Sequence, residues 1–294
     1  MPSTLIRARW RARAGFLLGC WLLASAPAQA GGGWTRKKKR GYAKVGLTTV
    51  STNRYHPLAG GDPLKGGAIE TARFRQQVYS VYGEYGLTDR LEATLSFPFF
   101  RRATFPDFSP GQGVGDPEIG LRYGVLTGKW PLAVGVAVEA PLGNPNVFGV
   151  DEADPNVYLR LPTGDGEWNV WTRAALSHSL EKLPAFLTLS AGYNKRTGGF
   201  TDQYTYGVQL GYKLFDKLWL TATGRTLDNV RPPDLTKFGS IGLGEGVAYS
   251  TAGLGASYNF TKNLSATADW ATGFGKLRNV YSGNQYTVGL AWEW

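Results

Sequence analysis

The most constraining feature of this sequence is a strict alternation of apolar residues with small or polar ones. In the last segment, Tyr286, Val288, Leu290 and Trp292 occupy every second position, and the residues between them are small or polar. Successive side chains of a β-strand point to opposite faces, so this spacing predicts a strand with one apolar face. The same pattern recurs, ended each time by a turn, over 118–125, 132–139, 203–213 and 264–270. The chain is therefore predicted to be all-β.

Two folds fit such strands, and they differ in which face is buried. In a soluble sandwich the apolar face packs inward, whereas in a membrane-spanning barrel it meets lipid and the polar face encloses a lumen. The non-apolar faces here are rich in Gly, Ala, Ser and Thr, where a solvated surface would carry more Lys and Glu. Aromatic residues gather near strand ends, as in Tyr258 with Phe260 and Trp292 with Trp294, which is typical of interfacial girdles. Both features favour the barrel.

Connection lengths support a closed antiparallel up-and-down transmembrane barrel over 40–294. About twelve strands are predicted, and a missed or merged hairpin would change the number to ten or fourteen. Their expected ranges are 40–51, 72–87, 90–101, 115–126, 130–141, 166–178, 184–196, 201–214, 217–227, 247–260, 263–275 and 281–294. Connections after even-numbered strands are short and polar, and the longest connections, 52–71, 102–114, 142–165 and 228–246, all follow odd-numbered ones. This asymmetry is typical of outer-membrane barrels and predicts both termini on the short-turn, periplasmic side.

Residues 1–30 have the pattern of a cleaved secretory signal peptide. Arginines 7, 9, 11 and 13 precede the apolar run 14–26, and Ala28-Gln29-Ala30 is a small-x-small cleavage site. We expect cleavage after Ala30, which leaves a short basic periplasmic segment, 31–39, ahead of the barrel. A lipoprotein-like box ending at Cys20 and an uncleaved anchor are the alternatives, but the apolar run continues past Cys20 and is short for a bilayer span.

Charge and composition exclude several classes of protein. Loss of the four signal-peptide arginines lowers the formal charge from +10 to +6, and part of that excess is the run Lys37 to Arg40. The remaining charges are mixed in sign, so no nucleic-acid partner is expected. Cys20 is the only cysteine and there are two histidines, too few for a zinc finger, a disulfide scaffold or a transition-metal site. We predict neither a metal nor a cofactor.

Charged residues on the predicted inner faces are the candidate site. In a narrow barrel, opposite charges pair across the lumen and narrow or plug it, or they bias permeation by sign and size if water fills it. A pairing role is favoured for most of them. The predicted lumen-lining residues are Glu84, Glu92, Glu118, Arg122, Glu139, Arg173, Lys213, Arg225 and Asp269, with Glu293 in the same phase.

Enzymatic chemistry finds little support in the sequence, and we predict that the protein is not an enzyme. A hydrolase would need a base beside a serine hydroxyl, and His178 between Ser177 and Ser179 is the candidate. The topology places it at a periplasmic turn, which favours a histidine in a polar turn. His56 lies in the first long loop. The acids Asp151, Glu152, Asp154, Asp165 and Glu167 offer oxygen ligands for calcium or for ions bridging lipopolysaccharide, but solvated loop acids are favoured.

Three stretches resemble a known outer-membrane family. The run 113–123 (GVGDPEIGLRY), the strand 131–140 leading into Pro141-Leu142-Gly143, and the run 161–167 (LPTGDGE) are similar to the MetA-pathway phenol-degradation family of Gram-negative bacteria. The turns Leu214-Phe215-Asp216-Lys217 and 260–263 also resemble that family's. The resemblance implies a barrel similar to transporters of hydrophobic or aromatic compounds, and it supplies no catalytic residues.

The sequence therefore predicts a bacterial outer-membrane channel that passively admits small solutes, which the resemblance implies are hydrophobic or aromatic. The alternative is a closed structural or adhesive barrel whose extracellular loops bind external ligands, and an outer-membrane hydrolase comes third. The expected partners are outer-membrane lipid, lipopolysaccharide, the barrel-assembly machinery and a small-molecule solute.

Overall fold

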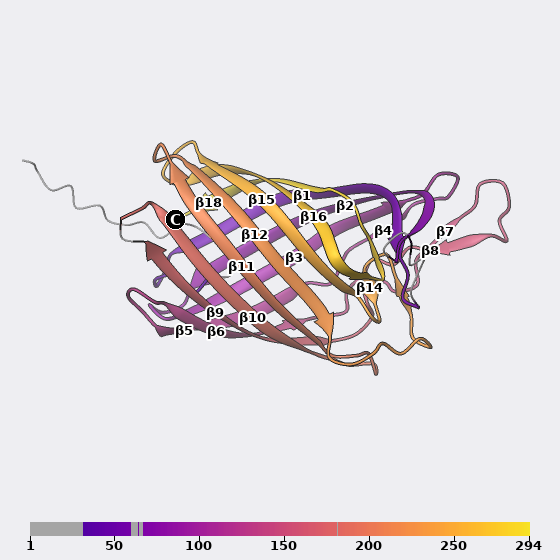
Figure 1. Cartoon of the computed structure of the whole chain (residues 1–294), viewed down its shortest axis with the longest axis horizontal. Coiled ribbons are helices and arrows are strands. Elements are labelled where there is room, and N and C mark those ends of the chain that lie inside the picture. The colour runs from indigo at the N-terminus through magenta and orange to yellow at the C-terminus, as the bar shows by residue number, and fades with distance from the viewer. Residues whose placement is uncertain (1–31, 60–63, 65–66, 181) are drawn as a thin grey trace, which may run out of the picture.

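The computed structural model describes residues 32–59, 64, 67–180 and 182–294, so the signal peptide and Ala30 lie outside the described residues. Twelve long antiparallel strands form a closed barrel (Figure 1). They are β1 (Gly41–His56), β2 (Ile69–Gly86), β3 (Leu91–Thr104), β5 (Glu118–Leu126), β6 (Leu132–Glu139), β9 (Asn169–Leu180), β10 (Ala185–Arg196), β11 (Gln203–Leu214), β12 (Leu218–Asn229), β15 (Ala248–Asn259), β16 (Leu264–Arg278) and β18 (Gln285–Glu293). The predicted fold class is confirmed.

Closure depends on the first strand, which pairs on both of its edges. Val45 lies opposite Leu290 of β18 on one side and opposite Val81 of β2 on the other. Every other strand pairs with its neighbours in chain order, so each long strand has two antiparallel partners. No edge of the wall is left unpaired, and this is the condition under which a sheet is stable in hydrocarbon.

The outer face of the wall is apolar, as the alternation predicts. In β18, Val288 is 54% exposed and Leu290 is 60% exposed, whereas Ala291 between the outward residues is 2% exposed. Ile119 of β5, at 64%, and Leu254 of β15, at 59%, are exposed in the same way. A soluble sandwich would bury these side chains, so the arrangement excludes it.

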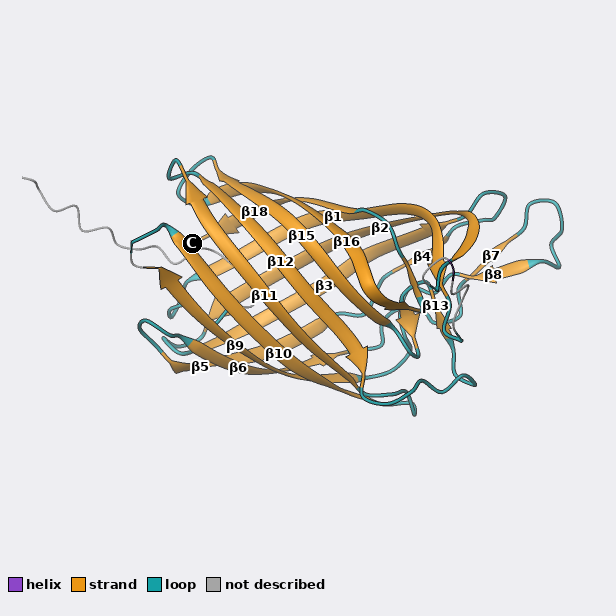
Figure 2. Cartoon of the chain, viewed as in Figure 1, coloured by secondary structure: helices purple, strands orange, loops and turns teal. Residues whose placement is uncertain are grey.

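The connections are short at one end of the barrel and long at the other, as predicted (Figure 2). At the short-turn end, 215–217 join β11 to β12, and Phe215 and Asp216 both have left-handed backbones, with φ of 51° and 59°. Two consecutive left-handed residues are the mark of a type I′ hairpin turn, whose twist matches that of paired strands. Trp294 pairs with Gly41 at this end, so the barrel starts and stops there.

The long-loop end carries additional short strands and extensions of the long ones. The strand predicted over 40–51 continues to His56, and the strand predicted over 263–275 continues to Arg278. Each is longer than predicted because its pairing with neighbouring strands extends past the predicted strand end. The short strands are β4 (Gly111–Gly113), β7 (Phe148–Val150), β8 (Tyr158–Arg160), β13 (Gly239–Ser240), β14 (Leu243–Gly244) and β17 (Val280–Tyr281). The β7–β8 hairpin projects beyond the barrel, at the right of Figure 1. The described residues contain no helix long and apolar enough to cross a bilayer.

Neighbouring residues of β11 provide a test of which face meets lipid. Leu210 is 53% exposed on the outer wall, and Gln209 lines the lumen. We expect Leu210→Arg to lower the free energy of unfolding by about 2–4 kcal/mol, because an arginine on the lipid face is poorly solvated. Gln209→Arg places the same charge in the lumen and should change it far less. The measurement is urea unfolding in lipid vesicles, and equal losses in both variants would contradict the assignment.

Candidate functional site

Three cavities follow one another along the inside of the barrel, with volumes of about 1050, 560 and 350 Å³. The first lies at the short-turn end and shares Tyr82 and Gln209 with the second. The second shares Arg225 with the third, which lies under the long loops. Consecutive cavities therefore adjoin at shared lining residues, and they are here called the short-turn, central and long-loop cavities of the lumen.

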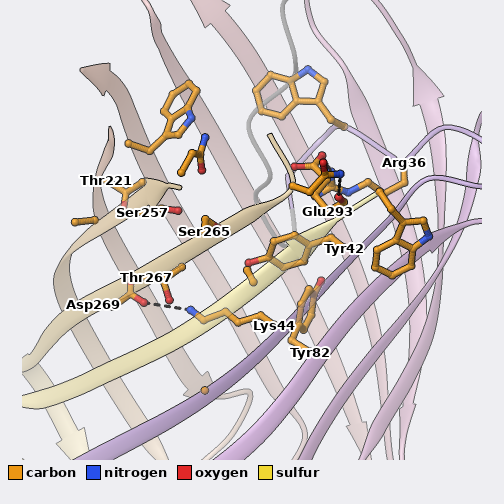
Figure 3. A pocket seen from close by; sticks show the side chains of 18 of the residues that line it. Arg36, Tyr42, Lys44, Tyr82, Thr221, Ser257, Ser265, Thr267, Asp269 and Glu293 are labelled. Carbon is orange, nitrogen blue, oxygen red and sulfur yellow. Dashed lines mark hydrogen bonds and ion pairs between the residues drawn. The ribbon is translucent and has the colours of Figure 1, made fainter. Parts of the chain in front are cut away.

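The short-turn cavity is a charged and aromatic chamber (Figure 3). Lys44 of β1 pairs with Asp269 of β16 across 3.3 Å. Lys213 also lines the cavity, and its Nζ lies 5.9 Å from the centre of the Trp219 ring. The alternation explains this placement, because the polar side chains of β1, β11 and β16 occupy the positions that point into the barrel.

The segment 32–40 enters this end of the barrel, with Gly32 and Gly33 buried inside and Lys37 to Arg40 exposed at the rim. Gly33 donates its backbone N–H to Ser177 Oγ of β9 at 2.8 Å, and the ring of Trp34 meets that of Phe186 edge-on at 5.9 Å between centroids. Arg36, a few residues on, pairs with Glu84 at 2.8 Å and with Glu293 at 2.5 Å. Strand β9 is far round the wall from the strands that carry these acids, so the segment crosses the lumen.

The predicted acids Glu84 and Glu92 are buried beneath this segment. Glu92 accepts the backbone N–H of Arg36 at 2.6 Å and pairs with Arg122 at 2.5 Å. Arg122 in turn donates to the carbonyl of Trp34 at 3.1 Å. A buried carboxylate without such partners would be costly, so the acids and the inserted segment stabilise each other.

The central cavity brings together residues from several strands. Glu118 of β5 and Arg173 of β9 form two hydrogen bonds of 2.6 Å each, a bidentate pair. Glu139 accepts from Asn169 Nδ2 at 3.1 Å. Arg225 donates only to Thr205 Oγ1, at 3.3 Å, and within the described part of the chain it has no ion-pair partner. The predicted inward residues that line a cavity are Glu118, Arg122, Glu139, Arg173, Lys213, Arg225, Asp269 and Glu293.

A buried arginine connects two long loops at the other end. Arg196, at the end of β10, is 4% exposed, pairs with Asp165 at 3.0 Å and with Glu167, and donates to the carbonyl of Gly244 at 2.9 Å. It therefore fastens the loop 140–168 to the loop 230–247. Burial raises the pKa of Glu167 to about 8, although the charge of Arg196 opposes the shift.

The acids of the third long loop do not form one cluster. Asp151 accepts backbone N–H groups of Ala153 and Asp154 in the β7–β8 hairpin, whereas Asp165 and Glu167 bind Arg196. Within the described residues no group of three or more His, Cys, Asp or Glu side chains is placed to hold a metal ion.

The histidine–serine arrangement needed by a hydrolase is not formed. His178 stacks on Trp130 at 4.0 Å between ring centroids, and its Nδ1 lies 2.8 Å from the carbonyl of Lys129. Ser177 faces the lumen, where its hydroxyl bonds Thr188 at 2.7 Å. Adjacent strand residues point to opposite faces, so the imidazole cannot reach the hydroxyl of Ser177. His56 is buried and bonds Ser282 at 2.9 Å.

Several residues of the lumen were missed by the sequence interpretation. Phe186 and Arg196 lie at inward-pointing positions of the strand predicted over 184–196. An aromatic and a charged residue on a face of small residues are the sequence signals that could have identified them as lumen residues. Arg101 was not predictable from phase, because a β-bulge between Phe97 and Phe100 inserts one extra residue into β3 and reverses its faces. The alternation of apolar and polar residues does not predict that the segment 32–40 enters the barrel, because this segment is not a strand.

Comparison with known proteins shows a shared fold. The chain is similar to the COG4313 outer membrane channel from Pseudomonas putida F1, with a TM-score of 0.64, 15% identity, and coverage of 90% of this chain and 99% of that one. It is also similar to the translocator domain of autotransporter NalP from Neisseria meningitidis (TM-score 0.51, 13% identity, 86% and 88% covered) and to the NanC porin (0.50, 9%, 85% and 98%).

No protein-family model matches the sequence, and no curated protein does either. The resemblance to the MetA-pathway phenol-degradation family therefore stays a prediction. The solved structures, all of low identity, establish the barrel fold that this chain shares with bacterial outer-membrane proteins.

The loop fastening at Arg196 is testable by proteolysis. Arg196→Met leaves Asp165 and Glu167 buried without their cation, which should lower the free energy of opening the two loops by about 3–5 kcal/mol. We expect faster protease cleavage within 140–168 and 230–247, with the barrel intact. The adjacent Lys195 is 67% exposed and pairs with Asp202, so Lys195→Met is the control. Equal protection of the loops in both variants would show that Arg196 does not fasten them.

Proposed function

We propose that this protein is a bacterial outer-membrane channel through which small solutes diffuse passively. The observation that carries the proposal is the sequence of three cavities with shared lining residues from one end of the barrel to the other. A structural barrel has no need of a polar, hollow interior, whereas a channel requires one. No cofactor or energy source enters the mechanism.

In the proposed orientation the long loops face the exterior and the short turns face the periplasm. This is the usual asymmetry of outer-membrane barrels and puts the inserted segment 32–40 at the periplasmic mouth. Export through a signal peptide cleaved after Ala30, contact with lipopolysaccharide and insertion by the barrel-assembly machinery belong to the same proposal.

The solutes are proposed to be small and hydrophobic or aromatic, as the sequence resemblance implies. The structure supports a narrow solute range, because the inserted segment and the paired charges restrict the short-turn end. Trp34, Tyr82 and Trp219 line that cavity and offer apolar surface to a passing ring.

The alternative is a closed structural or adhesive barrel with ligand-binding extracellular loops. Two features favour this alternative: the segment 32–40 crosses the lumen at one end, and Arg196 joins the loops that lie over the other end. A hydrolase is not favoured, because the imidazole of His178 stacks on Trp130 and bonds the carbonyl of Lys129 rather than a serine hydroxyl.

Conductance in planar bilayers decides between channel and closed barrel. We expect discrete single-channel currents from the wild type. The double variant Trp34→Ala/Arg36→Ala releases the inserted segment and should raise the single-channel conductance at least about twofold, because ion flow depends on the open cross-section. The exposed Lys38 provides the control variant Lys38→Ala. Absence of current in both the wild type and the double variant would favour the closed barrel.

A further inference from the structure

The long-loop cavity has a wall in which apolar and aromatic residues stand beside polar ones. It has a volume of about 350 Å³ and lies between the long-loop ends of several strands, with the loop 230–247 over it. Val50, Ile241, Leu277 and Tyr281 contribute to its wall. The volume is within the range of pockets that hold small organic ligands.

Aromatic rings are concentrated in this wall. Tyr281 stacks on Phe74 at 4.2 Å between centroids, and its ring is tilted against that of Tyr55 at 4.8 Å. Tyr249, from β15, lines the cavity as well, and it is half-buried like Tyr281. Partly accessible tyrosine rings offer a flat apolar surface on which another ring can stack.

The cavity also has an unbalanced positive charge. Its charged lining residues are Arg101 and Arg225, and none of the described residues that line it is an aspartate or a glutamate. Arg225 is exposed to the lumen, and its hydrogen-bond partner among the described residues is the hydroxyl of Thr205, at 3.3 Å. Elsewhere in the lumen Arg173 pairs with Glu118 and Lys44 with Asp269, whereas Lys213 lies against the Trp219 ring. The guanidinium of Arg225 is therefore available to an anion.

Arg101 is less available than Arg225. Its guanidinium donates to the carbonyl of Thr163 at 3.4 Å, and its Nε is buried without a partner. Asp165, Asp116 and Glu139 lie close enough to attract it, although none forms an ion pair with it. Those carboxylates offset part of its charge, so Arg225 is the stronger anion site.

We propose that the long-loop cavity binds small aromatic carboxylates, with the carboxylate at Arg225 and the ring against the tyrosine-containing wall. The pairing of a guanidinium with a carboxylate is the strongest polar contact available in the cavity, and stacking supplies the rest. This inference deepens the proposed channel function by naming an anionic aromatic class of solute, and it makes Arg225 a specificity-determining residue.

The test is a ligand-observed fluorine NMR titration of the full chain in detergent micelles with 4-fluorobenzoate. We expect saturable binding with a Kd of about 1 mM, the affinity typical of so small a ligand. Two matched probes separate the contributions: 4-fluorobenzyl alcohol keeps the ring without the charge, and fluoroacetate keeps the charge without the ring. Each should bind at least about tenfold more weakly than 4-fluorobenzoate.

Substitutions of single arginines test whether the ligand binds at Arg225. Arg225→Gln should weaken 4-fluorobenzoate binding about tenfold, and Arg225→Lys, which keeps the charge, should retain most of it. Arg101→Gln should have a smaller effect. Arg231 is an exposed arginine of the loop 230–247 outside the cavity lining, so Arg231→Gln is the control and should bind like the wild type.

Equal affinities for the three probes, or unchanged binding in a folded Arg225→Gln variant, would overturn the inference. If that variant does not fold, Arg225→Lys together with the probe series still decides it, because an anion site must prefer 4-fluorobenzoate to its alcohol. The titration needs no ion flow. A protein that conducts but does not discriminate between the probes loses this inference alone, and one that discriminates but does not conduct loses the channel proposal.

Discussion

Closure of the sheet is the constraint on which the rest of the structure depends. Hydrocarbon offers no hydrogen-bond partners, so every backbone N–H and C=O of a membrane-crossing strand must be satisfied by a neighbouring strand. Strand β1 meets this requirement by pairing with β18 on one edge and β2 on the other. Once the ring is closed, alternation sends every second side chain outward and the rest into a common interior. Both the apolar outer belt and the polar lumen follow from this one arrangement.

Inside the lumen, the pairing of charges determines what the barrel can do. Acids and bases from distant parts of the chain meet there: Arg36 from the segment 32–40 joins Glu84 of β2 to Glu293 of β18. Such pairs are stable because each partner compensates the other's loss of water. Arg225 stands apart with a hydroxyl as its partner. The lumen thus combines charges that are matched in pairs with a cation, Arg225, that forms no ion pair with any of the described residues.

The two ends of the barrel are restricted by different devices. At the short-turn end the chain itself enters the lumen, held by Ser177 and by the ring of Phe186. At the long-loop end the barrel stays hollow, and loops fastened through Arg196 lie over it. A solute that crosses the barrel in the proposed channel would therefore meet two different linings: an aromatic, cationic cavity under the loops, then a chamber of paired charges and tryptophans.

The sequence by itself determined the all-β barrel, the positions of its twelve strands to within a few residues, and which end has the short turns and which the long loops. It also determined that side chains such as Glu118 and Arg173 point inward. These features were predictable because the periodicity of a strand is local and shows in every second residue. Only the tertiary structure decided which charges pair, where 32–40 lies and that Arg101 faces inward. Pairing across the lumen depends on the register of strands far apart in the chain, and the insertion of a segment depends on the space that a closed barrel leaves. A one-residue bulge in β3 reverses which side chains point inward, but it interrupts the apolar pattern too little to be recognised in the sequence.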